Sequence, residues 1–258
     1  KKMSTVLVTG GTGFLAIHII QQLLLHNYVV HTTVRDVNST YAIKLKNFDN
    51  QHQQLKIFQA DLLQQNSFDT AMFGCDIVIH VASVFTNNNV DNPYDEIVKP
   101  AKLGTVNVLE SVNRIKTVKH VILTSSIAAI HHDNSVRGKV FSEGDWNTDS
   151  TIDNSPYRYS KKVSEDVAWS MMAKQDRWDM VTINPSLILG ENLLRRDNEG
   201  SMWFIRKIID GSWYTHPNIQ VNIVDVRDVA NAHVLAIDYL QNKPKLDTCN
   251  EDANERSE

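Results

Sequence analysis

Short runs rich in β-branched residues alternate with longer segments of helical periodicity along most of this chain. That alternation is typical of a parallel sheet covered by helices. The predicted strands cover residues 5–9, 28–34, 55–59, 76–81, 119–124 and 180–184. Helices are expected at about 40–48, 64–72, 93–116, 156–174 and 200–210, and a polar loop is expected at about 131–155. The pattern predicts an α/β fold with a doubly wound parallel sheet.

Apolar stripes predict which faces of the helices are buried. Each stripe follows the three-to-four-residue spacing of one helix face. A final helix follows an extended piece at 219–224. The stripes are Ile17, Ile20 and Leu24; Val163, Val167 and Met171; and Val226, Val229 or Ala230, His233 or Val234, and Ile237.

Glycines follow the first strand directly. The segment Gly10-Gly11-Thr12-Gly13-Phe14-Leu15-Ala16 joins that strand to a helix. At such a junction the pyrophosphate of a dinucleotide lies on backbone N–H groups at the positive helix end. The small Ala16 stands where the third glycine of the motif usually allows helix and strand to pack. This placement favours a dinucleotide site over a ligand-free connection.

The residue at the end of the second strand indicates which dinucleotide binds. An NAD site usually offers Asp or Glu there, about 20 residues after the glycines. This chain offers Arg35, whose planar fork suits a 2′-phosphate, and Lys44 could add a second positive charge. NADP(H) is therefore preferred, while the adjacent Asp36 leaves NAD(H) open as an alternative.

Three residues could carry proton chemistry. Tyr157 and Lys161 are four apart on a predicted helix and share one face, and an ammonium beside a phenol favours the phenolate. Such a pair can protonate an alkoxide as hydride arrives. Ser126 follows the fifth strand at the sheet edge where ligands bind, and its hydroxyl can hydrogen-bond a substrate oxygen. Tyr159 lies on another face and lacks a lysine four residues on.

Taken in order, these motifs resemble the extended short-chain dehydrogenases/reductases of the NAD-dependent epimerase/dehydratase superfamily. Within that family they are most similar to the dihydroflavonol reductase-like branch of carbonyl and aldehyde reductases. The resemblance covers about residues 4–240. It rests on Thr9-Gly10-Gly11-Thr12-Gly13-Phe14-Leu15, Thr33-Val34-Arg35-Asp36, Asp61-Leu62, His80-Val81-Ala82-Ser83, Lys99-Pro100-Ala101 with Gly104-Thr105, Thr124-Ser125-Ser126, Tyr157 to Lys161, Asn184-Pro185, and Val224-Asp225-Val226-Arg227-Asp228-Val229-Ala230.

The resemblance implies a Rossmann-type cofactor domain and assigns the site. Ser126, Tyr157 and Lys161 would form the catalytic set, and Tyr157 and Lys161 would also contact the cofactor, Lys161 at the nicotinamide ribose. Substrate would meet Ser126, Tyr157, Val84 and Phe85. The remaining cofactor contacts would come from Thr9, Gly10, Thr12, Gly13, Phe14, Leu15, Arg35, Lys44, Asp61, Leu62, Val81, Ala82, Ser83, Thr124, Ser125, Pro185, Leu187 and Ile188.

The resemblance implies an NADPH-dependent reductase of aldehydes or ketones, in which Tyr157 delivers the proton. Two alternatives stay open. One is a nucleotide-sugar epimerase or dehydratase on the same scaffold. The other is a protein that binds and senses NADP(H) without catalysis, against which the intact Ser126, Tyr157 and Lys161 set argues.

The amino-acid composition limits the classes of partner that this protein can bind. Lys and Arg number 26 and Asp and Glu 30, so the net charge is −4, with no dense basic run that would bind nucleic acid or an anionic membrane. The two cysteines, Cys75 and Cys249, support neither a disulfide scaffold nor a zinc module, and His131-His132-Asp133 lacks the spacing of a metal site. We expect a cytoplasmic protein that binds a small carbonyl compound and no metal, and a homodimer stays open.

The chain is long enough for two domains of unequal size. Of its 258 residues, 1–180 would form the NADP(H)-binding domain with the catalytic set, and 181–258 a smaller C-terminal substrate-binding lobe. We expect that lobe to be incomplete, and the segment around 219–240 to pack back on the cofactor domain.

Overall fold

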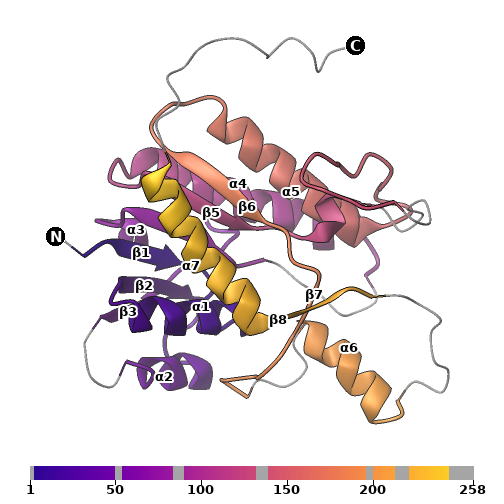
Figure 1. The fold of residues 1–258 in the computed structure, drawn as a ribbon, viewed down its shortest axis with the longest axis horizontal. Coiled ribbons are helices and arrows are strands. Elements are labelled where there is room, and N and C mark those ends of the chain that lie inside the picture. Colours follow the sequence, from indigo (N-terminus) through magenta and orange to yellow (C-terminus); the bar gives the residue numbers. More distant parts are fainter. Residues whose placement is uncertain are drawn as a thin grey trace.

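Six parallel strands form the central sheet, in the order β3-β2-β1-β4-β5-β6 (Figure 1). The computed structural model describes residues 3–49, 54–83, 90–131, 139–195, 200–212 and 221–243, with all side chains in these ranges except those of 203 and 204. This strand order places β1 and β4 at the centre, where the order along the chain reverses. The strands are β1 Thr5–Val8, β2 Val29–Val34, β3 Leu55–Gln59, β4 Ile77–His80, β5 His120–Thr124 and β6 Asp179–Ile183.

Both faces of the sheet are buried, because successive side chains of a strand point to opposite faces. In β1, Val6 and Val8 belong to one apolar core and Leu7 to the other. In β4, Ile79 belongs to the same core as Val6 and Val8, and Val78 belongs to the same core as Leu7. A strand buried on both faces has a continuous run of apolar residues. The sequence pattern therefore predicts these strands closely.

Helices cover the two faces in two groups. One core takes its helical side chains from α1, α2 and α7, and the other from α3, α4 and α5. Figure 1 shows α7 crossing the sheet beside α1, far from it in sequence, and the two helices are in contact. The helices are α1 Phe14–Leu25, α2 Thr40–Lys46, α3 Asp69–Met72, α4 Lys99–Arg114, α5 Pro156–Met172 and α7 Val226–Asn242.

The predicted helix 93–116 forms in two parts. A π-helical turn, Tyr94–Val98, runs directly into α4, and the Lys99 N–H donates to the Tyr94 carbonyl. Pro100 lies in the first turn of α4 and has no N–H to offer to a carbonyl four residues earlier. The wider turn therefore sits where the proline prevents a regular α-helical ladder.

A small second sheet lies near the carboxyl end of the main one. β7 Leu187–Leu189 pairs in parallel with β8 Ile223–Asp225. Figure 1 shows α6 Gly200–Ile209 beyond these strands and away from the six-stranded sheet. Among the described residues, no helix is long and apolar enough to cross a membrane.

The structure corrects three expectations. The strand β7 was not predicted, because three residues before Gly190 are too short for a periodic signal. The helix expected at 64–72 is only the four-residue α3, since Asn66 adopts a left-handed conformation with φ 63° and interrupts helical geometry. The predicted stripe of Val163, Val167 and Met171 is only partly buried, whereas the buried positions of α5 are Ser160, Glu165 and Ala168.

The stripes on α1 and α7 agree better with the structure. Ile17 and Ile20 are buried and Leu24 is partly buried, and α7 buries the predicted positions from Val226 to Ile237.

Candidate active site

The glycine turn is tied to the end of β2. Gly11 N–H donates to the Thr33 carbonyl at 2.8 Å, and Gly10 N–H donates to Thr33 Oγ1 at 3.2 Å. Gly10 has φ +72°, and a Cβ there would lie 3.0 Å from the Ala82 Cβ. The backbone can therefore turn tightly and stay close to β4 only with glycine at this position.

The first turn of α1 is open to an anion. Gly13 is the N-cap residue, no side chain caps the helix, and the first turn contains no acidic residue. Helix N-termini expose N–H groups and carry a positive partial charge. A phosphate placed there would therefore meet N–H donors for which the structure shows no side-chain cap within the described ranges.

A large pocket of about 640 Å³ runs from this turn to the start of α5. Its volume is within the range of cofactor sites. Of the residues expected at the site, the large pocket is lined by Gly10, Thr12, Gly13, Phe14, Leu15, Arg35, Asp61, Leu62, Val81, Ala82, Ser83, Thr124, Ser125, Ser126, Tyr157, Lys161, Pro185 and Ile188.

Three expected contacts lie outside that lining. Thr9 lies beneath the floor, and Leu187 precedes Ile188 in β7. The Lys44 ammonium donates to the Leu194 carbonyl at 3.2 Å and lies 5.2 Å from the centre of the Tyr41 ring. Their roles toward a cofactor stay predictions. Val84, Phe85, His132, Asp133 and Cys249 lie outside the described residues.

Thr9 shapes the pocket floor from below. Its Oγ1 accepts hydrogen bonds from the N–H groups of Val81 and Ala82, each at 3.0 Å. With both acceptor positions used, the hydroxyl proton is donated to Nδ1 of His80, 2.9 Å away. Burial, followed by the nearby Lys161 charge, lowers the pKa of His80 to about 3. His80 is therefore a neutral acceptor that helps to fix the end of β4.

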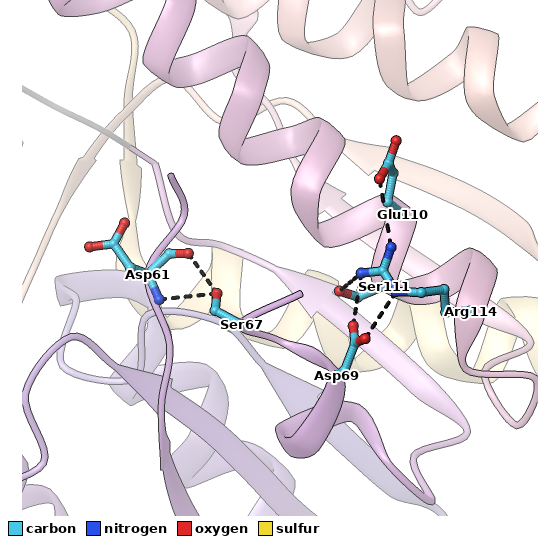
Figure 2. Close-up of polar contacts among 6 residues, drawn as sticks. All are labelled: Asp61, Ser67, Asp69, Glu110, Ser111 and Arg114. Atoms are coloured by element: carbon cyan, nitrogen blue, oxygen red, sulfur yellow. Dashed lines mark hydrogen bonds and ion pairs between the residues drawn. The ribbon is translucent and has the colours of Figure 1, made fainter. Parts of the chain in front are cut away.

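The Asp61-Leu62 turn is held by its neighbours and leaves the Asp61 carboxylate facing away from Ser67 (Figure 2). The Ser67 hydroxyl donates to the Asp61 carbonyl at 2.7 Å and accepts the Asp61 N–H at 3.3 Å. Asn107 of α4 donates to the Leu62 carbonyl at 2.7 Å. The turn is therefore anchored from two sides where it lines the pocket.

Three side chains that could perform proton chemistry line the other end of the pocket. Ser126 follows β5, and its Oγ accepts the Ala128 N–H at 3.1 Å. Tyr157 lies in the first turn of α5 and is 42% exposed. The Lys161 Nζ lies 5.8 Å from the centre of the Tyr157 ring and donates to Ser83 Oγ at 3.2 Å. The structure thus brings residues from β5 and α5 to the same pocket as the glycine turn.

Residues 7–253 match the 3-beta hydroxysteroid dehydrogenase/isomerase family. The chain belongs to this family. Cinnamoyl-CoA reductase CAD2 from Medicago truncatula is 38% identical over 238 residues, which cover 90% of this chain and 72% of that protein. Anthocyanidin reductase from Arabidopsis thaliana is 36% identical over 241 residues, covering 88% and 70%.

A solved structure shares the fold of this chain. Gre2 from Candida albicans in complex with NADPH has a TM-score of 0.79 at 30% identity, covering 93% of this chain and 76% of that chain. The relatives confirm the predicted resemblance to dihydroflavonol reductase-like reductases, and the structure and its neighbours confirm the Rossmann-type fold.

Some lining residues of this family member were not predicted. Most adjoin a predicted residue in sequence, so the motifs point close to them. Gly200 and Ser201 come from the start of α6, where no motif gives a signal. The unpredicted lining residues are Ala16, Thr33, Val34, Ala60, Leu63, Phe68, Ser186, Gly200 and Ser201.

Proposed function

We propose that this protein is an NADPH-dependent reductase that converts an aldehyde or ketone to an alcohol. One observation carries this function: Ser126, Tyr157 and Lys161 line the same pocket as the uncapped N-terminus of α1. Relatives named as cinnamoyl-CoA reductase and anthocyanidin reductase, each above 30% identity, support the same reaction class.

The residues present fit NADPH. A Cβ at Gly13 would lie 3.1 Å from the Gly10 carbonyl oxygen, so glycine lets this turn close without crowding at the N-terminus of α1. Arg35 is exposed at the rim and provides a cation for a 2′-phosphate. Gre2, whose structure contains NADPH, has the same fold. NADPH would supply the hydride when bound.

Each member of the set has a distinct role. The Ser126 hydroxyl hydrogen-bonds the carbonyl oxygen and stabilises the charge that develops on it. Tyr157 gives its phenolic proton to that oxygen, because its side chain lines the pocket and is 42% exposed. The Lys161 ammonium stabilises the phenolate left behind and binds the nicotinamide ribose.

A paired substitution tests this assignment. Purified protein is mixed with NADPH, or separately with NADH, and with aromatic and aliphatic aldehydes, ketones, ketoesters and a cinnamoyl-CoA thioester, while cofactor absorbance is followed. Tyr157→Phe should lower kcat by about 10²- to 10⁴-fold and leave NADPH binding intact. Tyr159→Phe, two residues away on another face of α5, is the matched control and should retain turnover. Near-normal kcat in Tyr157→Phe would overturn the role of Tyr157.

The same assays separate the alternatives. Turnover of a nucleotide sugar without net NADPH consumption would favour an epimerase or dehydratase. Tight NADPH binding with no turnover of any carbonyl compound would favour a sensing protein. The division at residue 180, the homodimer and the cytoplasmic location stay predictions, tested by limited proteolysis, light scattering and cell fractionation.

A further inference from the structure

A buried carboxylate lies behind the catalytic set. Glu165 is 3% exposed and continues the face of α5 that begins with Tyr157 and Lys161, at steps of four residues. None of the ion pairs found between described residues includes it. A buried carboxylate without a close cation is costly unless several donors satisfy it, so its contacts indicate why it is there.

Three donors converge on this carboxylate. Oε2 accepts from the Ser125 hydroxyl and from Asn184 Nδ2, the latter at 2.9 Å. Oε1 accepts from Trp169 Nε1 at 3.1 Å. The same Asn184 amide also donates to the Ser126 carbonyl at 3.2 Å. Glu165 therefore holds the ends of β5 and β6 together where Ser126 leaves the sheet.

A small cavity connects the carboxylate with Lys161. It measures about 20 Å³, enough for about one water molecule. Its lining includes Lys161 and Glu165 together with Ser164, whose Oγ is buried and has no hydrogen-bond partner in the part of the chain that the structure describes. A buried hydroxyl that lacks a partner beside a polar cavity of this size indicates a bound water molecule.

The charges around the cavity are few. From β4 it is faced by His80, which is neutral because burial lowers its pKa to about 3. The α4 residues that line it, among them Thr105, carry no charge. Asp166 follows Glu165 in the chain and lies outside the lining. Burial is the main reason that the Asp166 pKa is raised, and the Glu165 charge raises it further. Lys161 is thus the only cation, and Glu165 the only anion, among the lining residues.

We propose that Glu165 is a positioning residue for the reductase site, which rests on the proposed function. It fixes the Ser126 main chain through Asn184. Its carboxylate also lines the small cavity beside Lys161 and binds Ser125, so it holds the face of α5 that carries Tyr157 and Lys161 against the end of β5.

Glu165→Gln tests the charge, with Asp166→Asn as the matched control on the same helix. Glu165→Gln should lower kcat by about 10- to 100-fold, because misplacement of Ser126 by a fraction of an ångström weakens catalysis. It should change the KM for the carbonyl compound and the Kd for NADPH far less than kcat, because Ser126 acts on the charge that develops in the transition state. Asp166→Asn should leave kcat, KM and Kd unchanged.

Asn184→Ala tests the hydrogen-bonded link and keeps the charge. It should also lower kcat with little change in KM, and it decides the positioning role if Glu165→Gln fails to fold. Wild-type kcat in Asn184→Ala, or wild-type kcat in folded Glu165→Gln, would overturn the role of Glu165. Near-normal turnover in Tyr157→Phe would instead refute the proposed function, so the two failures are distinguishable.

Discussion

Two buried histidines should make the fold sensitive to mild acid. His233 is fully buried in α7, where its Nδ1 donates to the Val229 carbonyl at 2.7 Å and its Nε2 accepts from Thr124 Oγ1 at 2.8 Å. His80 is 3% exposed and accepts from Thr9. Neither ring can take a second proton without losing a hydrogen bond and burying a charge.

The size of the effect follows from the pKa values. Burial lowers the pKa of His233 to about 4 and that of His80 to about 3, whereas an unfolded histidine has a pKa of about 6.5. Between these values the unfolded chain binds more protons than the folded one, so stability is complete above about pH 6.5 and falls as pH decreases. From pH 7 to pH 5 each ring should reduce the free energy of unfolding by about 2 kcal/mol, and both by about 4 kcal/mol.

Urea unfolding at pH 7 and pH 5 measures this loss. His233→Gln removes one titrating ring, so its free energy of unfolding should fall by about 2 kcal/mol less than that of the wild type over the same range. His26→Gln is the control, because His26 is exposed at the end of α1. Burial also lowers the pKa of His31, which adds a loss of the same sign to every variant. An unchanged pH dependence in His233→Gln would refute the reasoning.

Three further substitutions test the cofactor end and the fold. Arg35→Ala should weaken NADPH binding by about tenfold or more and leave NADH binding nearly unchanged, as titration with each cofactor would reveal; equal losses would contradict a 2′-phosphate contact. Gly11→Ala would place a Cβ 2.2 Å from Thr32 Oγ1, and should cost about 1–3 kcal/mol in urea unfolding at neutral pH. Asp69→Asn breaks a bidentate pair with Arg114, each bond 2.9 Å, and should cost about 0.5–1 kcal/mol (Figure 2). Since Arg114 holds the Asp69 pKa below its usual value, this difference should be complete above about pH 4 and vanish as pH falls through the lowered pKa.

The sheet could be predicted because its signal is local. Both faces of β1 and β4 are buried, so each strand is a continuous apolar run bounded by polar residues. The glycine turn could be predicted equally well. Both the tight turn and the close approach of its backbone to a pyrophosphate require glycine at fixed positions after the strand. By contrast, the π-helical turn before Pro100 depends on how one missing N–H is accommodated, which periodicity does not report.

The buried face of α5 shows the limit of reading periodicity. An apolar stripe predicts burial only where apolar side chains provide the contacts, and the contacts of Glu165 are polar. In the sequence, Lys161 and Glu165 at four-residue spacing look like a solvent-exposed pair, the usual meaning of that pattern on a helix. The burial of Glu165 depends on Ser125, which is 40 residues from it, and on Asn184, which is 19 residues away, and these groups meet only when β5 and β6 pair. A polar site of this kind is built by the sheet and then covered by the helix, so it becomes visible only when the tertiary structure is known.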